Sequence, residues 1–363
     1  MQSVSLIDMK AIWIFGATGL SGRGVARELV DHGADVVLVG RDQNKLAAVA
    51  KSVGGSADTR VVADLAELIR LVEVETPGVV VNAVGPYSAT SVPLARACIA
   101  AGVHYVDQAN ELEPVLDLFE LDDEARRGGV TLVTGAGFGV LATEALVLEL
   151  RSGRHAPARA MVAAAPAVQE LGSSVLDSTV DAIAYGGRRY QGGRLVRSRL
   201  GAHHERIPIP GAEPRKALAV PTGELEATRR ASNAGDVIAY SSEAPTGRVI
   251  RTVLPAVSAL LAVRPIRAAV HRLIGRMSLK PPRTGGDVSW AYARLEWADG
   301  SHREAWLRTG EGYAFTAKVA ALTAERLGNE STPRGAFTPG ALFGADLARQ
   351  AGGEIVTQKD VVA

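Results

Sequence analysis

A regular alternation of short apolar runs and helical patterns over the first 150 residues is the feature that most constrains the fold of this chain. Short apolar runs are typical of strands buried on both faces of a parallel sheet. The predicted strands are Ala11–Phe15, Asp35–Val39, Arg60–Ala63, Val79–Ala83, His104–Asp107 and Val130–Val133. The predicted helices are Gly22–His32, Asn44–Val53, Leu65–Glu75, Val92–Ala101, Leu112–Arg127 and Ala142–Leu150. This pattern predicts an α/β fold with a doubly wound parallel sheet.

After Ser152 the strand-like runs become in part longer and more alternating, which predicts a second α+β domain with a mostly antiparallel sheet. Asp299-Gly300 predicts a hairpin turn within residues 297–301. Residues 203–234 read as an irregular connection, which also suits a loop on the substrate side. The predicted domains are a nucleotide-binding domain over 1–150, an α+β substrate and dimerisation domain over 151–325, and a C-terminal segment over 326–363 that packs back on the first domain.

Composition narrows the function classes. The 363 residues are 47% hydrophobic and 22% charged, with a net charge of +1, so we expect a globular protein with no overall attraction to nucleic acid. Cys98 is the only cysteine, which fits a reducing cytoplasm and excludes a thiolate metal cage. The apolar stretch 253–270 contains two prolines and two arginines, so we interpret it as a buried or amphipathic helix and expect no membrane partner.

A glycine-rich loop joins the first predicted strand to the first predicted helix. Its GxxGxxG spacing is a variant of the dinucleotide-binding fingerprint, in which glycines permit a tight turn and a close approach of the backbone to pyrophosphate. Its position at the first strand–helix junction is the context that this motif requires. The residues expected to hold the cofactor here are Gly16, Ala17, Thr18, Gly19, Leu20, Ser21 and Gly22.

The end of the second strand indicates which cofactor binds. Gly40 lies 18 residues beyond Gly22, near the position where NAD-specific folds carry an acid for the ribose 2′-hydroxyl. Arg41 follows, and its guanidinium suits a 2′-phosphate, so the sequence favours NADP(H). The alternative is a solvated Arg41 beside a helix-capping Asp42. Asp64, after the third strand, is expected beside the adenine or is a plain turn residue.

The fourth predicted strand leads into Asn82-Ala83-Val84-Gly85-Pro86-Tyr87. Ligands of open α/β sheets bind outside the carboxyl ends of the strands, so this segment should pass the nicotinamide ribose. We therefore expect Asn82, Val84, Gly85 and Pro86 to contact the cofactor. A plain strand followed by a Gly-Pro turn is the alternative.

At these residues the chain resembles the saccharopine dehydrogenase-like oxidoreductases, including proteins of the trans-acting enoyl reductase type. The likeness is firm over residues 10–150, returns over about 285–350 and is faint between. The segments that carry it are GATGLSG (16–22), LVGRD (38–42), NAVGPY (82–87), AGVHYVDQANE (101–111), GVTLVTGAGFG (129–139), GEGYAFTAKVA (310–320) and TPGALFG (338–344).

The resemblance implies an NADP-binding Rossmann domain, a second substrate domain, and an active site in the cleft between them. It implies that Gly137 and Phe138 lie beneath the nicotinamide, and that residues 311–313 face the cofactor. The family often has a proline and an aspartate where this chain has Leu141-Ala142-Thr143-Glu144. A substrate role inherited from those positions is therefore not expected to transfer.

The chain lacks the Tyr-x-x-x-Lys pair of short-chain dehydrogenases, because none of its seven tyrosines has lysine four residues later. An imine or iminium carbon is already electrophilic, so this absence favours reduction of a C=N bond by NADPH. The candidate proton donors are Tyr87 and the cluster His104…Asp107…Glu111. His104 can equally be a strand residue, and the two acids can equally cap the next helix.

Three other functions remain open: an enoyl (C=C) reductase, a saccharopine-type amino-acid dehydrogenase with Arg188, Arg189, Arg194, Arg197 and Arg199 as carboxylate clamps, and a non-catalytic NADP(H)-binding protein. We expect a small-molecule substrate, with a place in secondary metabolism, and a homodimer. No metal site is expected at His203-His204-Glu205. The two histidines are adjacent on an extended segment, so their side chains point in opposite directions.

Overall fold

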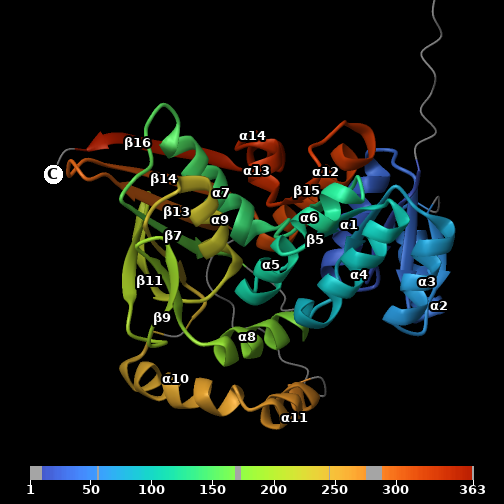
Figure 1. The fold of residues 1–363 in the computed structure, drawn as a ribbon, viewed down its shortest axis with the longest axis horizontal. Coiled ribbons are helices and arrows are strands. Elements are labelled where there is room, and N and C mark those ends of the chain that lie inside the picture. Colours follow the sequence, from blue (N-terminus) through green and yellow to red (C-terminus); the bar gives the residue numbers. More distant parts are fainter. Residues whose placement is uncertain (1–9, 55–56, 168–172, 245, 275–287, 362–363) are drawn as a thin grey trace, which may run out of the picture.

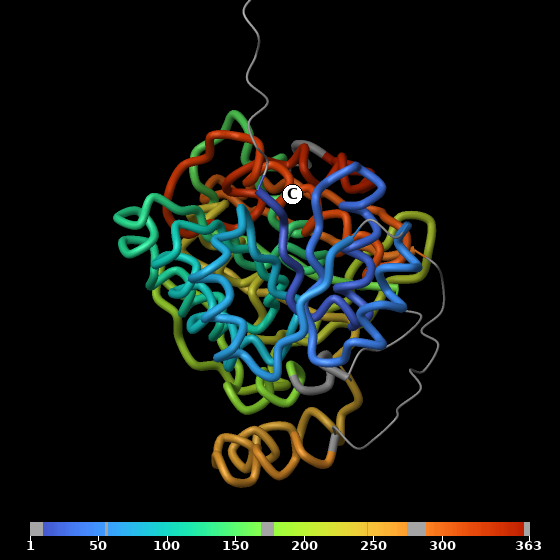
Figure 2. The backbone as a smooth tube through the Cα atoms, turned by 90° about the vertical axis from the view of Figure 1, so that its right-hand side faces the viewer, coloured from blue at the N-terminus to red at the C-terminus, as the bar shows by residue number. Residues whose placement is uncertain are grey.

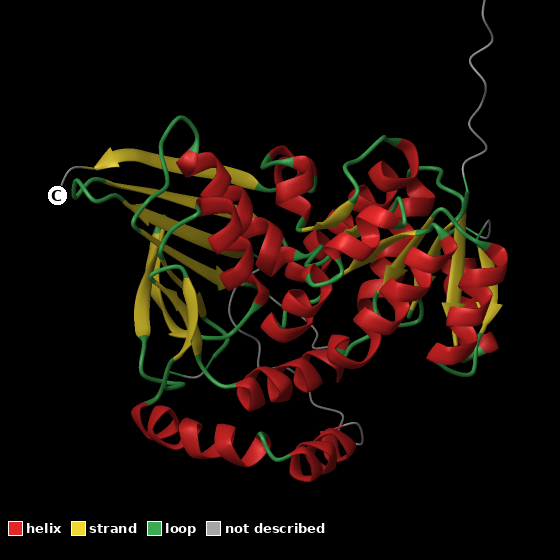
Figure 3. Ribbon diagram, in the orientation of Figure 1, coloured by secondary structure: helices red, strands yellow, loops and turns green. Residues whose placement is uncertain are grey.

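The computed structural model describes residues 10–54, 57–167, 173–244, 246–274 and 288–361. Two sheets lie at opposite ends of the molecule with helices between and around them (Figure 3). The first sheet is formed almost wholly by the N-terminal third of the chain. The second sheet is formed by later residues, so the break in pattern after Ser152 corresponds to a change of sheet.

The first sheet is parallel throughout, with strand order β15-β6-β5-β4-β1-β2-β3. Its strands are β1 (Ile12–Phe15), β2 (Val36–Gly40), β3 (Asp58–Val61), β4 (Val79–Asn82), β5 (His104–Asp107), β6 (Thr131–Val133) and β15 (Gly335–Phe337). The chain runs outward from β1 to β3 and then returns to β4 on the other side of β1. The loops after β1 and β4 therefore diverge at a switch point, and the predicted doubly wound parallel sheet is confirmed.

Helices cover both faces of this sheet, which explains its continuous apolar runs. Ile12 and Ile14 point to one core, whereas Trp13 and Phe15 point to another. The helices are α1 (Leu20–Asp31), α2 (Gln43–Ser52), α3 (Leu65–Glu75), α4 (Tyr87–Ala101), α5 (Leu112–Phe119) and α6 (Asp122–Arg127). The single helix predicted over 112–127 is wrong, because the chain leaves helical geometry at Leu121, whose side chain turns into the core.

The second sheet is mixed, with the main order β10-β11-β12-β7-β13-β14-β16 and the β8–β9 hairpin attached to β12. Only the pair β12–β7 is parallel in this sheet, among the strands that the structure describes. The strands are β7 (Arg159–Ala165), β8 (Arg188–Gln191), β9 (Arg194–Arg197), β10 (His204–Ile209), β11 (Ala212–Ala219), β12 (Asp236–Ser241), β13 (Ser289–Glu296), β14 (His302–Thr309) and β16 (Glu354–Val361). The predicted hairpin turn at 297–301 is confirmed, with Gly300 at φ +83° and Trp297 N donating to Ser301 O at 2.9 Å.

The irregular connection predicted over 203–234 is wrong. This segment forms β10, β11 and the helix α9 (Gly223–Ser232). The sequence did not predict the first of these strands because it contains a proline. Pro208 lies in β10, and β10 is an edge strand, so the missing N–H interrupts no hydrogen bonds between central strands. Trp306 Nε1 donates to Pro208 O at 2.7 Å and fixes this edge to β14.

The remaining helices are α7 (Phe138–Arg151), α8 (Ser173–Tyr185), α10 (Arg248–Leu261), α11 (Arg264–Ile274), α12 (Gly312–Asn329), α13 (Pro339–Phe343) and α14 (Asp346–Gln350). Of these, α7 and α12 pack against the sheets, whereas α10 and α11 lie on the outside of α8 (Figure 1). α7 packs on β13 and β14 of the second sheet, and α12 packs on α1, β4 and β5 of the first. In the C-terminal segment β15 joins the first sheet and β16 extends the second, and neither strand was predicted from the sequence.

Candidate functional site

The loop between β1 and α1 has the geometry of a phosphate cradle. Gly16 has φ +86°, and a Cβ there would lie 2.5 Å from Val84 Cγ2. A Cβ at Gly22 would lie 2.3 Å from Gly16 O, so α1 can approach the loop this closely only without a side chain. Gly19 is the N-cap of α1 and supplies no side-chain acceptor, which leaves the first amides of the helix to bind an anion. These features fit the pyrophosphate of a dinucleotide.

The 2′-phosphate side of the loop is formed by the end of β2. Gly40 faces the loop, since a Cβ there would lie 3.7 Å from Thr18 Cγ2. Arg41 is exposed, and no hydrogen bond or ion pair to another described residue holds its guanidinium. Asp42 Oδ1 caps α2 by accepting from Asn44 N and Lys45 N.

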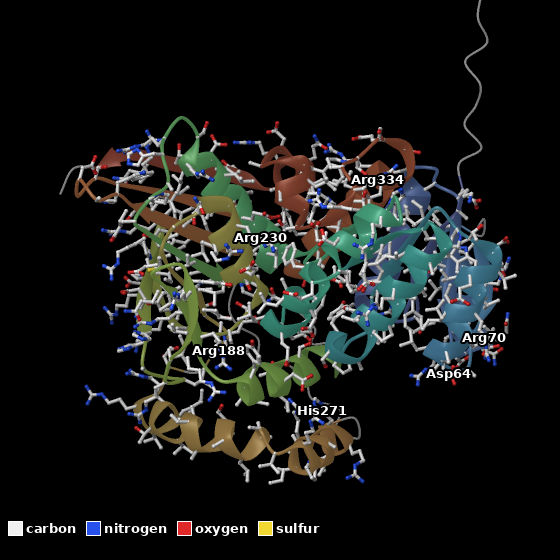
Figure 4. All side chains as sticks on the ribbon, viewed as in Figure 1. Asp64, Arg70, Arg188, Arg230, His271 and Arg334 are labelled. Carbon is white, nitrogen blue, oxygen red and sulfur yellow. The ribbon has the colours of Figure 1, made fainter. Side chains whose placement is uncertain are left out.

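Asp64 lies at the end of the first sheet far from the second sheet (Figure 4). Its carboxylate caps α3 by accepting from Glu67 N at 2.9 Å. This is the turn role that the sequence left open as the alternative to an adenine contact.

The loop after β4 is fixed against the glycine loop by a buried amide. Asn82 Oδ1 accepts from Val84 N at 3.1 Å, and Asn82 Nδ2 donates to Thr90 Oγ1 and Tyr105 OH. Gly85–Pro86 is a cis peptide bond. The residues predicted to pass the nicotinamide ribose are thus held beside Gly16 by contacts that need no ligand.

Asp107, at the carboxyl end of β5, is fully buried and is hydrogen-bonded to the segments that surround it. Its Oδ1 accepts from Thr134 Oγ1 at 2.8 Å and from Ala109 N at 3.1 Å, and its Oδ2 accepts from Ser91 Oγ and Tyr105 OH at 3.0 Å. Burial raises the pKa of this carboxyl, against the lowering effect of its hydrogen bonds. Asp107 does not line the cavity described below, so the structure makes it a positioning residue.

The structure does not bring His104 to the site. Residues 104 and 107 stand at opposite ends of β5, about 10 Å apart at the rise of an extended strand. His104 Nδ1 accepts from Thr131 N at 3.0 Å, and Nε2 faces Arg334 at 3.2 Å. Burial and then Arg334 lower the pKa of this imidazole to about 4. The predicted role of His104 as a proton donor is therefore wrong.

A cavity of about 400 Å³ opens between the carboxyl edge of the first sheet and the second sheet. The elements around the first sheet contribute Ser21 of α1, Ala83 after β4 and Tyr87 of α4, and the start of α7 contributes Gly137 and Phe138. Gly312, Tyr313 and Thr316 come from the start of α12. The far wall is apolar and includes Ile183, Leu200, Leu218, Val220 and Leu254.

The polar end of the cavity contains two buried carboxyl groups. Glu111 Oε1 accepts from Ser178 Oγ at 2.5 Å, and Glu224 Oε1 accepts from Asn110 Nδ2 at 3.4 Å. Glu224 Oε2 and Gln108 Nε2 are buried and have no hydrogen-bond partner in the described part of the chain. Burial raises the pKa of both carboxyl groups. Two unpartnered polar atoms in one cavity can hydrogen-bond to a ligand or to water that enters it.

No lysine, arginine or histidine lines this cavity among the described residues. The arginines considered as carboxylate clamps lie on or just after the β8–β9 hairpin and outside the cavity lining; Figure 4 labels Arg188. The described residues also contain no group of three or more His, Cys, Asp or Glu placed to hold a metal ion. The cavity therefore has an apolar wall and an electronegative end.

The structure thus gathers Ser21, Tyr87, Gly137 and Phe138 around one cavity, with the glycine loop at the same edge of the sheet. The sequence did not identify Gln108, Ser178 or Glu224 as site residues. Glu224 lies on α9, inside the segment predicted to be irregular. No local motif marks it, because only the packing of the second sheet against the first brings it to the cavity.

The fold and the glycine loop define a dinucleotide-binding protein of the Rossmann class. Residues 12–133 match the family described as "Saccharopine dehydrogenase NADP binding domain". This match identifies residues 12–133 as an NADP-binding domain.

Two relatives match about a third of this chain, and one solved structure shares its fold. A trans-acting enoyl reductase of Mycobacterium ulcerans is 35% identical over 135 residues, 35% of this chain and 32% of the relative. A putative trans-acting enoyl reductase of Mycobacterium tuberculosis is 32% identical over 148 residues, 38% of this chain and 35% of the relative. The matched region thus spans about a third of these relatives. Saccharopine dehydrogenase (L-Glu forming) of Saccharomyces cerevisiae shares the fold, with a TM-score of 0.58 and 15% identity over 96% of this chain and 100% of that one.

Proposed function

We propose that this protein is an NADPH-dependent reductase that reduces the C=N bond of a small, largely apolar imine or iminium. The observation that carries the proposal is the polar end of the cavity, where Glu111 and Glu224 are buried without a basic residue in the described lining. An iminium is a cation, and its N–H would give Glu224 Oε2 the partner that it lacks.

The bound cofactor supplies a hydride to the substrate carbon. The chain's own residues do the rest: the glycine loop and Arg41 bind the phosphates, and Tyr87 and Phe138 border the space beside the loop after β4. The carboxyl group of Glu224 holds the proton that a neutral imine nitrogen takes as its C=N electron pair becomes an N–H bond. Burial, Asp107 and Glu111 raise the pKa of Tyr87 well above its ordinary value, so its hydroxyl stays protonated and can donate a hydrogen bond.

An enoyl reductase is the second candidate, and the names of the mycobacterial relatives favour it. In that case Tyr87 would donate to the carbonyl oxygen conjugated to the reduced C=C bond. A saccharopine-type dehydrogenase has less support, because no arginine reaches the described cavity lining to hold substrate carboxylates.

The decisive experiment follows NADPH oxidation by the purified full chain with cyclic imines, an enoyl thioester and a ketone. We expect the imines to react fastest. In Glu224→Gln the kcat/KM for imines should fall at least about a hundredfold, because the group that donates the proton is lost. Glu213→Gln, an exposed change on β11, is the matched control and should leave it unchanged. Fastest turnover with the enoyl thioester would favour the second candidate, and NADPH binding without turnover would favour a non-catalytic protein.

The cofactor preference has its own test. Fluorescence titration should show tighter binding of NADPH than of NADH, and Arg41→Glu should remove that difference. Arg70→Glu makes the same charge change on the outer side of α3, away from the loop (Figure 4), and should preserve it. Equal affinity of the unmodified chain for both cofactors would contradict the role of Arg41.

A further inference from the structure

The helices α10 and α11 form a separate outer layer that contacts α8; Figure 2 shows the pair (gold) at the lower edge of the molecule. Seven of the ten large hydrophobic side chains that the described residues expose lie on this pair or between its helices. Val249, Val253 and Leu260 follow helical spacing along one side of α10 and are 78%, 50% and 54% exposed. We name the seven the outer apolar face: Val249, Ile250, Val253, Val257, Leu260, Val263 and Leu273.

Hydrogen bonds on the opposite side fix this orientation. Ser258 Oγ donates to Ile183 O at 2.6 Å, and Arg251 Nε donates to Gly201 O at 2.9 Å. His271 Nε2 lies 3.0 Å from Asp181 Oδ1, which ties α11 to α8. The inner side of the pair thus packs on α8 through these hydrogen bonds and through Leu261 and Val270, which leaves the outer apolar face exposed.

The charged side chains of α10 and α11 are all basic. Residues 248–274 contain five arginines and no aspartate or glutamate, in a chain whose net charge is only +1. Arg248, Arg264 and Arg272 are exposed. An apolar stripe bordered by arginines is typical of helices that lie in the interface of an anionic membrane.

We propose that α10 and α11 dock the protein, lying flat, on an anionic lipid surface. The apolar side chains would enter the headgroup region while the arginines meet lipid phosphates. A second copy is a poor occupant, because a two-fold contact would place arginines against arginines with no acid between them. No single described helix is long and apolar enough to cross a membrane, and α10 with α11 reaches that length only as a pair bent by 107°.

The sequence led us to expect no membrane partner, and this proposal differs from that expectation. A membrane at this surface would also be a source of apolar ligands for the cavity. Leu254 of α10 and Ile183 of α8 both line the cavity. A bilayer on the outer apolar face would therefore lie just beyond the cavity wall. The docking proposal does not depend on which bond the enzyme reduces.

Vesicle flotation of the full chain tests the proposal. We expect the protein to float with vesicles that contain phosphatidylglycerol, to float far less with pure phosphatidylcholine vesicles, and to be released by high salt. Failure to float with the anionic vesicles would overturn the proposal. Equal, salt-independent flotation with both vesicles would also overturn it, because the arginines would then have no part.

Two pairs of variants separate this surface from a general effect. Val253→Asp/Leu260→Asp should abolish flotation, whereas Val74→Asp, at a side chain 79% exposed on α3, should not. Arg248→Gln/Arg264→Gln should weaken anionic binding by at least about tenfold, and Arg70→Gln/Arg127→Gln, with the same charge change elsewhere, should not. NADPH binding by each variant checks that it is folded. A dimer that Val253→Asp/Leu260→Asp splits, without any vesicle binding, would assign the surface to self-association and overturn the proposal.

Discussion

Glu144 is an acidic side chain that is fully buried in α7. Its carboxyl accepts from Thr338 Oγ1 and, at 2.9 Å, from Gly340 N, which ties α7 to α13. It does not line the cavity, so we assign it a structural role.

Glu144 should make stability depend on pH. Burial raises its pKa to about 7 in the folded chain, from an ordinary 4.5. Its contribution is therefore fully present below pH 4.5 and is lost as the pH rises through 7, because the folded state must then either keep the proton or bury a charge. A shift of this size is worth roughly 3 kcal/mol. Glu144→Gln should remove this loss, so urea unfolding at pH 5 and pH 8 should show the variant gaining stability relative to wild type at the higher pH.

The control for that measurement is Glu149→Gln in the same helix. Glu149 pairs with Arg349 at 2.8 Å on the surface, so its replacement should change the pH 5 to pH 8 difference by less than about 1 kcal/mol. An unchanged pH dependence in Glu144→Gln would mean that Glu144 does not titrate in this range.

At the scale of elements, the sequence predicted the first sheet well because each of its first six strands is a local apolar run between helices. The seventh strand, β15, was not predicted, since it pairs with β6 across about 200 residues of chain. The start of α12 was predicted to face the cofactor and lines the cavity, while the rest of this helix is core.

Within the site, too, features encoded by neighbouring residues were predicted and features formed by long-range packing were not. The glycine loop and Arg41 follow one another along the chain, so spacing alone could place them. Glu224 and the apolar wall reach the cavity only through the packing of α9 and α8 against the first sheet. The cofactor half of the site was therefore predictable from the sequence, and the substrate half was not.

The helix α9 is anchored by Glu226, which is 2% exposed. Its carboxylate accepts from Arg229 Nη2 at 2.6 Å, from Arg230 Nε at 2.7 Å and from Tyr190 OH at 2.5 Å, which joins α9 to β8. Glu226→Gln should lower the free energy of unfolding at pH 7 by about 1.5–3 kcal/mol, as expected for lost bonds to a charged group. Urea unfolding measures this loss, and Glu213→Gln provides the exposed comparison.

The pH dependence of that effect has a definite sign. Hydrogen bonds from Arg229 and Tyr190 hold the pKa of Glu226 below its ordinary value, although burial acts the other way. Its contribution is thus present above the ordinary pKa and is lost as the pH falls through the folded value. Wild type and Glu226→Gln should converge in stability in acid, and a constant difference down to pH 3 would contradict this account.

At the scale of the whole molecule, the two sheets share one apolar core. Ile14 and Leu38 of the first sheet belong to the same buried cluster as Val162 and Leu295 of the second. Phe315 of α12 joins this cluster, and its ring meets the ring of Phe138 edge-on at 5.8 Å. Because neither sheet can lose its helices without exposing the other's core, we expect the chain to unfold as one unit.

Scanning calorimetry can test this together with cofactor binding. The unmodified chain should show one transition with equal calorimetric and van't Hoff enthalpies. NADPH at a hundred times its Kd should stabilise the whole unit by about 2.7 kcal/mol, because it binds only the folded state. Gly22→Ala, whose Cβ would meet Gly16 O, should lose that shift. Two transitions, of which NADPH moves only one, would show that the shared core does not couple the sheets and that the cavity between them can open without unfolding either.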